Sequence, residues 1–155
     1  MTKLLCRIVA EVNSAESPTP VEALNRVLSE VIDVVQDVKQ AQWRVSGAHD
    51  LHAVLGDLFD DLKSWALLLM EEDVALGGSP LTSMPSVAGR KPLNLWTGIA
   101  NEEDVRRIVG EHLDQFGQHV RAVISDLEDG SVRTTLAGVE QGLLVHRQAL
   151  SDQDG

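Results

Sequence analysis

The chain has 155 residues, 43% of them hydrophobic and 24% charged, a balance that fits one globular domain and excludes wholesale disorder. Asp and Glu number 24 against 13 Lys and Arg, and the net charge of -11 argues against nonspecific binding to nucleic-acid phosphates. A lone cysteine, Cys6, excludes an internal disulfide, and no apolar run reaches the roughly 18–20 residues of a membrane span. Arg7 and Glu11 interrupt the apolar start, so we expect a soluble, cytoplasmic protein with no membrane partner.

Residues 1–18 are interpreted as an N-terminal tail that precedes a domain over residues 19–152. The basic residues of the tail are Lys3 and Arg7, and two acidic residues balance them. Five apolar residues have the spacing of a short amphipathic segment, which we expect to dock on the protein or on a neighbour: Leu4, Leu5, Ile8, Val9 and Val12.

The first helix is predicted to begin at the run TPVE, residues 19–22, which combines an N-cap threonine, a proline at the first helical position and a capping-box glutamate. Apolar residues then recur at steps of three and four until Gly47, the expected stop. A second helix is predicted from about Asp50 to Leu76, and we expect Glu72 to be the one polar interruption of its apolar stripe.

Residues 77–100 are rich in Gly and Pro and predict a long connection, with a short helix around residues 93–99. A third helix is predicted from the capping residue Asn101 to a stop at residues 129–130, and a fourth over about residues 131–150. Four glycines in these helices are expected at close helix contacts: Gly110, Gly117, Gly138 and Gly142. The sequence therefore predicts an all-α, ferritin-like four-helix bundle with one long crossover between helices 2 and 3.

The negative charge is concentrated in two predicted helices. Residues 48–78 carry a net charge of -6, and residues 101–130 carry -5. Surfaces of this kind raise the local concentration of cations.

The end of the first helix has the sequence QAQWRVSG at residues 40–47, which resembles the pattern Q-A-H-W-N-x-x-G of the Dps miniferritins, the DNA-binding proteins from starved cells. His52 and the exit LGGSPL at residues 76–81 resemble the second helix of the same family, and the likeness is specific over about residues 19–82. The resemblance implies a homo-oligomeric shell, a dodecamer, that stores iron in a stress response and oxidises Fe(II).

In that family, ferrous ions bind between two subunits on imidazole and carboxylate ligands, which suit iron. Carried onto this chain, the histidine of the first helix falls on Gln42, and that of the second falls on His52, which is retained. The two aspartates fall on Gly56 and Leu67, and the glutamate falls on Glu71, which is retained. The resemblance thus implies iron binding at His52 and Glu71, and leaves ferroxidase activity open because only two of five positions are kept.

Acidic neighbours offer replacements for the lost ligands. They lie adjacent or one turn apart on the second helix: Asp57, Asp60, Asp61, Glu71, Glu72 and Asp73. Such acids either share a cation or form a solvated, cavity-lining face.

Gln42 lies on an apolar stripe, so we expect a buried, hydrogen-bonded structural glutamine.

The histidines of the later helices are weaker ligand candidates. His112 and His119 are seven residues apart, whereas helical ligand pairs prefer spacings of three or four. His146 occupies an apolar position and is interpreted as a packed core histidine.

The leading hypothesis is a Dps-like miniferritin that sequesters iron in an oligomeric shell with weak or altered ferroxidase activity. The alternative is a ferritin-fold structural or interaction protein that has lost its metal centre and assembles alone or with an intact paralogue. DNA compaction is a third hypothesis. It is disfavoured because some family members bind DNA through Lys-rich tails, and here the tail holds only Lys3 and Arg7 as basic residues.

Overall fold

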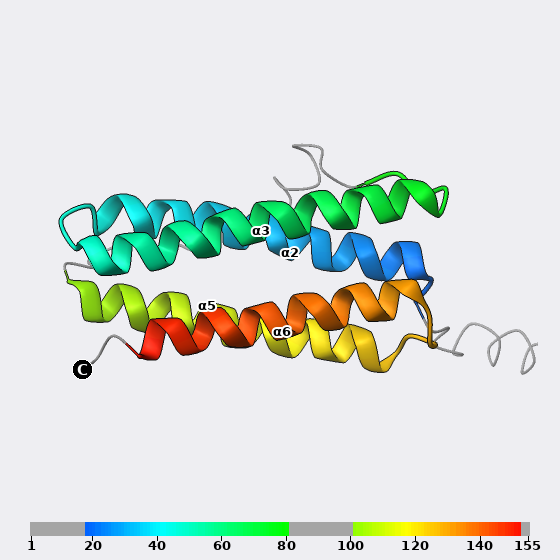
Figure 1. Cartoon of the computed structure of the whole chain (residues 1–155). Helices are drawn as coiled ribbons and strands as arrows, with labels where there is room; N and C mark the ends of the chain where they lie inside the picture. Colours follow the sequence, from blue (N-terminus) through cyan, green and yellow to red (C-terminus); the bar gives the residue numbers. More distant parts are fainter. Residues whose placement is uncertain (1–17, 81–100, 153–155) are drawn as a thin grey trace, which may run out of the picture.

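A computed structural model describes residues 18–80 and 101–152, which form four helices packed as a bundle (Figure 1). The helices are α2 (Pro20–Arg44), α3 (His49–Ala75), α5 (Glu102–Ser125) and α6 (Ser131–Ser151). The predicted all-α bundle with one long connection is confirmed. The short helix predicted at residues 93–99 and the docking segment predicted in the tail lie outside the described residues.

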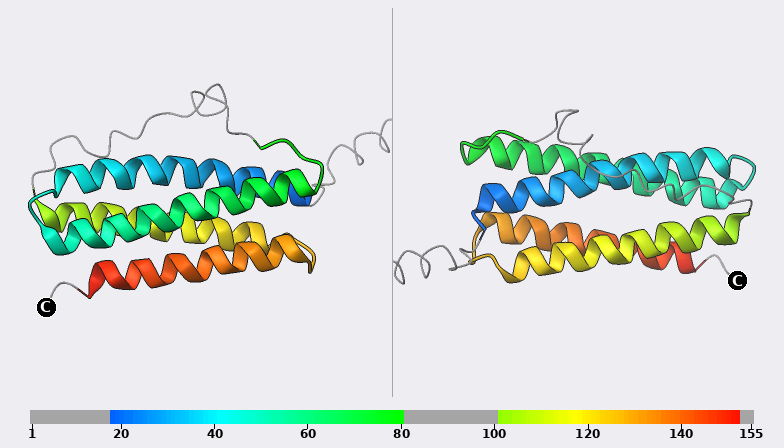
Figure 2. Two further views of the ribbon diagram at one scale, coloured as in Figure 1. Left: turned by 45° about the horizontal axis from the view of Figure 1, so that its top comes forward. Right: turned by 180° about the vertical axis from the view of Figure 1, so that it is seen from behind.

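The bundle consists of two antiparallel hairpins, α2 with α3 and α5 with α6. The views in Figure 2 show α2 beside α5 and α3 beside α6, which agrees with the contacts between these pairs. The hairpins meet so that α3 ends at one end of the bundle and α5 begins at the other, as a single long crossover requires (Figure 1). None of the helices in the described ranges is long and apolar enough to cross a bilayer.

The helix ends follow the local chemistry of the sequence. Thr19 Oγ1 accepts from the Glu22 backbone N–H at 3.2 Å, and Glu22 Oε2 accepts from the Thr19 N–H at 3.2 Å, which completes the predicted capping box. Asn101 caps α5 by accepting from the backbone N–H of Asp104 at 2.9 Å. Gly77 adopts a φ of 80°, a left-handed conformation that glycine tolerates and that ends α3.

Buried apolar side chains run along the inner face of every helix. The largest of them are fully buried in one continuous core: Leu24, Leu28, Leu51, Leu55, Leu58, Leu62, Leu69, Leu113, Phe116, Leu136 and Leu150. The complete buried sets of α3 and α6 advance by three or four residues at each step, so the amphipathic stripes read from the sequence account for the bundle.

Three histidine–carboxylate pairs link the two hairpins. The pairs are His112 Nδ1–Asp37 Oδ2 at 3.1 Å, His119 Nδ1–Glu30 Oε2 at 2.8 Å and His146 Nε2–Asp61 Oδ2 at 2.6 Å. The first two join α5 to α2, and the third joins α6 to α3. The Arg121–Glu140 pair at 2.8 Å and the Arg147–Asp114 pair at 3.1 Å, by contrast, lie within the α5–α6 hairpin.

Close helix contact explains some, but not all, of the helical glycines. A Cβ atom on Gly142 would lie 2.2 Å from Cζ2 of Trp65, so only glycine admits the indole ring there. A Cβ on Gly110 would lie 3.0 Å from the guanidinium carbon of Arg147. No atom lies within 4 Å of a Cβ placed on Gly117 or Gly138, so the close approach expected at these two positions is wrong.

This difference between glycines of α6 gives a matched test. We expect Gly142→Ala to destabilise the fold by about 1–3 kcal/mol, because the Trp65 ring has to move out of its packed position. Gly138→Ala in the same helix has free space and should stabilise the fold by about 0.5–1 kcal/mol. Urea unfolding midpoints of the two variants check the prediction, and equal shifts would contradict it.

Candidate metal centre

The structure brings together three of the five positions that the resemblance assigns to iron ligands. Gln42 lies near the end of α2, facing the first turns of α3, which carry His52 and Gly56. Gln42 Nε2 donates to the carbonyl oxygen of His52 at 3.3 Å. The same nitrogen lies 3.0 Å from the place where a Cβ atom of residue 56 would be. The amide of Gln42 therefore occupies the space that the missing side chain of Gly56 leaves open.

The other end of this amide is also engaged. Lys39 Nζ donates to Gln42 Oε1 at 3.0 Å, one turn earlier on the same helix. The Gln42 residue is only 8% exposed, and it has hydrogen bonds at both its oxygen and its nitrogen. The predicted structural, hydrogen-bonded glutamine is confirmed, and its oxygen is occupied by an ammonium group.

Two lysine side chains, one of them the partner of Gln42, lie against the same aromatic ring. Lys39 Nζ lies 4.6 Å from the centre of the Phe59 ring, and Lys63 Nζ lies 4.5 Å from the centre of the same ring. Both contacts have the geometry of cation–π interactions, which hold an ammonium group on an aromatic face. The ammonium group of Lys39 on Gln42 opposes the entry of a divalent cation by Coulomb repulsion, whereas Lys63 pairs with Asp60 at 2.9 Å.

His52 and Glu71, the retained ligand positions, cannot meet within one chain. They are 19 residues apart on the straight helix α3, a separation of about 28 Å at the helical rise of about 1.5 Å per residue. His52 is half-buried and Glu71 is exposed. A site built from both residues requires two copies of the chain, so the predicted iron site at these residues stays a prediction.

Two of the acids that were considered as replacement ligands already have partners. Asp60 lies 2.9 Å from Lys63 Nζ, and Asp61 lies 2.6 Å from His146 Nε2. Asp57 is exposed and makes no ion pair within the described ranges. Across residues 18–80 and 101–152, no three His, Cys, Asp or Glu side chains form a group able to hold a metal ion.

The histidines of α5 and α6 contact carboxylates of the neighbouring helices. His112 and His119 lie near two different carboxylates of α2, so these contacts do not draw them to a common point. His146 is 8% exposed and meets the Trp65 ring edge-on, with 6.1 Å between the ring centres. The interpretation of His146 as a packed core histidine is confirmed.

The end of α3 holds a feature that the sequence pattern misplaced. Asp73, not Glu72, is the polar residue on the buried stripe, because the stripe advances four residues from Leu69. The Asp73 residue is 0% exposed, and neither carboxylate oxygen has a hydrogen-bond partner. Gly78 makes room for it, since a Cβ atom there would clash with Asp73 Oδ1. Continuing the four-residue step in the sequence would have identified this buried acid.

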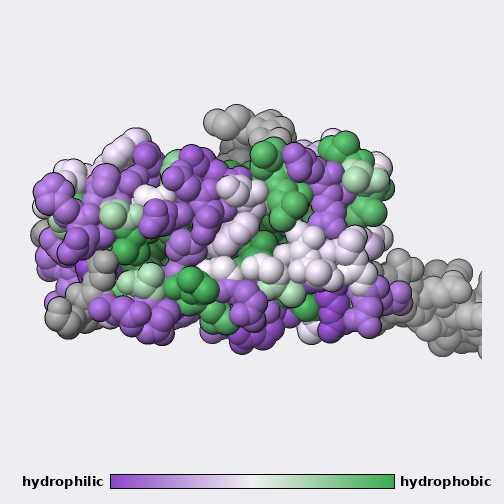
Figure 3. All heavy atoms as spheres, in the orientation of Figure 1, coloured by the Kyte–Doolittle hydropathy of each residue, from purple (hydrophilic) through white to green (hydrophobic). Residues whose placement is uncertain are grey.

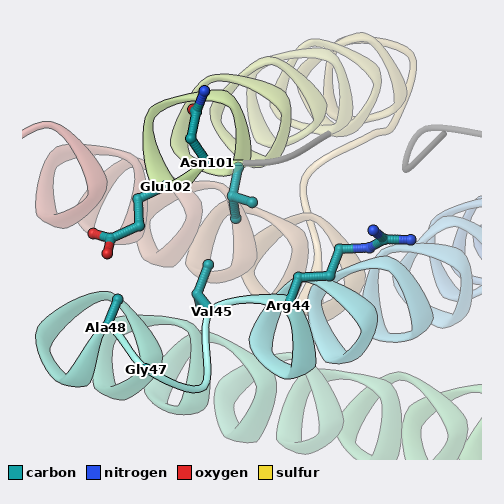
Figure 4. Close-up of a pocket in the computed structure, with 7 residues that line it drawn as sticks. Arg44, Val45, Gly47, Ala48, Asn101 and Glu102 are labelled. Carbon is teal, nitrogen blue, oxygen red and sulfur yellow. The ribbon is translucent and has the colours of Figure 1, made fainter. Parts of the chain in front are cut away.

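A hollow of about 470 Å³ lies at the end of the bundle near Gln42, between the α2–α3 turn and the start of α5 (Figure 4). Its lining residues are Arg44, Val45, Gly47, Ala48, Asn101, Glu102 and Val105. The charged groups of Arg44 and Glu102 point in opposite directions in Figure 4, so they do not converge on a ligand.

Removing the buried carboxylate of Asp73 should strengthen the fold. A buried polar group without a partner costs about 1–3 kcal/mol, so we expect Asp73→Ala to raise the free energy of unfolding by about 1–2 kcal/mol. Glu71→Ala, two residues away on the exposed face, should change it by less than about 0.5 kcal/mol. Thermal and urea unfolding measure both variants. Destabilisation by Asp73→Ala would show that the carboxylate binds a partner in solution.

No protein-family profile matches the chain. Among solved structures, a point mutant of Dps1 from Mycobacterium smegmatis superposes with a TM-score of 0.79 at 16% identity, covering 91% of this chain and 98% of that one. Dps92 from Deinococcus radiodurans superposes with a TM-score of 0.78 at 22% identity, covering 86% of this chain and 84% of that one. At these identities the likeness concerns the fold, and this chain has the ferritin-like four-helix fold of Dps proteins in a strongly divergent sequence.

Proposed function

We propose that the chain is a subunit of a Dps-like oligomeric shell that sequesters iron on carboxylates and oxidises it slowly. The ferritin-like fold shared with two Dps structures supports the assignment to this class. The observation that carries the iron function is the outer face of α3, where Asp57 and Glu71 are exposed and make no ion pair within the described part of the chain. Carboxylate oxygens of this kind bind hard and borderline cations.

Assembly is supported by apolar side chains on the outside of the bundle. Leu67 is 58% exposed and Val74 is 60% exposed on the same face of α3. Figure 3 shows apolar groups over the later turns of this helix, between hydrophilic stretches. Exposed apolar patches bordered by polar residues are typical of protein–protein contacts. The contact proposed here joins copies of this chain, in the dodecamer that the family resemblance implies.

In this shell Fe(II) is the substrate. The acidic surfaces of α3 and α5 raise the concentration of ferrous ions, and the free carboxylates bind them and nucleate a mineral. His52 of one subunit and Glu71 of another are the candidate ligands at the subunit contact. Oxidation is slow in this proposal because Gln42 offers no free oxygen and Lys39 places an ammonium group beside it.

A second function has a specific observation in its favour. Gln42 binds Lys39 and lies over Gly56. A neutral amide and an ammonium group thus occupy the positions that the resemblance assigns to iron ligands. This packing suits a structural or interaction protein that has lost its metal centre and assembles alone or with a metal-competent paralogue. The acidic outer surface disfavours DNA as a partner.

Assembly and iron content can be measured together. We expect the full chain to elute as a particle of about 200 kDa, twelve times 16.9 kDa, by size-exclusion chromatography with light scattering. After loading with Fe(II), iron should co-elute with the protein, and Asp57→Asn with Glu71→Gln should retain less of it. Glu16→Gln with Asp154→Asn removes the same charge outside α3 and α5 and is the control. A shell without iron would support the second function, and a metal-free monomer would exclude both.

The role of His52 has its own test. We expect His52→Ala to lower the initial rate of Fe(II) oxidation above the protein-free rate by about tenfold, since imidazole is a good ferrous ligand. His49→Ala, an exposed histidine one turn earlier on α3, should leave the rate unchanged. Stopped-flow absorbance of the ferric product measures both variants. Equal rates would remove His52 from the candidate site.

A further inference from the structure

A groove lies at the end of the bundle opposite the α2–α3 turn. It has a volume of about 420 Å³ and is formed where α2 begins, α3 ends and the α5–α6 turn crosses between them. Leu127 and Val132 are buried in its wall, whereas Leu76 is 47% exposed. Pro18, the first described residue of the chain, also lines the groove. The groove therefore offers an apolar surface beside the point where the N-terminal segment joins the bundle.

We propose that this groove is the docking site of the chain's own N-terminal segment, residues 4–12, in the same subunit. Leu4, Leu5, Ile8 and Val12 recur at the spacing of one helix face, and Val9 extends that face. An amphipathic helix of this kind binds by laying its apolar side into an apolar groove. The proposal concerns an intramolecular contact and does not depend on the proposed iron function.

The length of the connecting chain permits this contact. Residues 13–17 separate the apolar face from Pro18, and an extended chain spans at most about 3.3–3.6 Å per residue. The step from Val12 to Pro18 therefore reaches about 20 Å, enough to place the segment over a groove that Pro18 itself lines. A short tether also gives the segment an effective local concentration of about 1 mM, which favours its own groove over that of another subunit.

The charges of the two surfaces are complementary. The rim of the groove carries Asp126, Glu128 and Asp129, and Arg133 pairs with Asp129 at 3.3 Å. Asp126 and Glu128 make no ion pair within the described ranges. The proposed segment holds Arg7 and Glu11, and Lys3 directly precedes it, so residues 3–12 carry a net charge of +1. Docking would place these two cations near the free acids of the rim and would cover Leu76.

The lone native cysteine allows a direct test in the full chain. Cys6 lies inside the proposed segment, and Ser131 is an exposed residue of the groove, so Ser131→Cys supplies a disulfide partner of nearly the same shape. Ser46→Cys, exposed at the other end of the bundle, is the matched control. Under mild oxidation we expect an intrachain disulfide with Ser131→Cys at a yield at least about fivefold above that with Ser46→Cys.

Two substitutions test whether the groove itself causes the contact. Leu76→Asp should lower the cross-linking yield of Ser131→Cys to the control level, whereas Leu68→Asp, at a leucine of similar exposure on the same helix, should not. Ile8→Asp in the segment should have the same effect as Leu76→Asp and leaves the bundle untouched. Equal yields at positions 131 and 46 would overturn the proposal. Disulfide-linked dimers in place of intrachain products would also overturn it, because the segment would then dock on a neighbour.

Discussion

The arrangement of the bundle depends on one close contact between its two hairpins, where the ring of Trp65 lies against Gly142. A methyl group on residue 142 would stand 2.2 Å from the indole, so this approach of α3 to α6 requires glycine. The contact also positions His146, whose ring meets Trp65 edge-on and whose Nε2 lies 2.6 Å from Asp61. Packing between the hairpins thus decides which carboxylates have a partner. Asp61 pairs with His146, whereas Asp57 remains exposed.

At the candidate metal centre, too, side-chain packing decides which chemical groups are present. Gln42 and Gly56 form one packed arrangement, because the glutamine amide lies where a side chain at residue 56 would begin. A side chain at residue 56 would begin 3.0 Å from Gln42 Nε2, so the amide, held by hydrogen bonds to Lys39 and to the His52 carbonyl, would have to shift. An iron-ligand set at this point of the bundle would therefore need more than one substitution, because Gln42 and Gly56 are packed together.

Local signals in the sequence were sufficient for the fold and insufficient for the contacts of the site. The capping box at residues 19–22 and the three-and-four spacing of apolar residues predicted the helices, because both depend on neighbours within one helix. His119 and Glu30 are 89 residues apart, and a pair of this kind follows only from the packing of two helices. Burial of Gln42 was predictable from its stripe, but the ammonium group of Lys39 on its oxygen was not. The four-residue step from Leu69 points to Asp73 as the inward acid, whereas the apolar stripe alone suggests Glu72.

Iron sequestration and iron oxidation, the two parts of the proposed function, place different demands on a protein. Sequestration needs carboxylates that are free and distributed over a surface, and no fixed geometry beyond that. Rapid oxidation needs several ligands held at one point with positions open for the oxidant. Histidine pairs and Lys63 use part of the acidic surplus within and between helices, yet Asp57 and Glu71 remain unpaired within the described residues. In the proposed shell these two carboxylates would collect ferrous ions, whereas the space beside Gly56 is filled by an amide that binds an ammonium group.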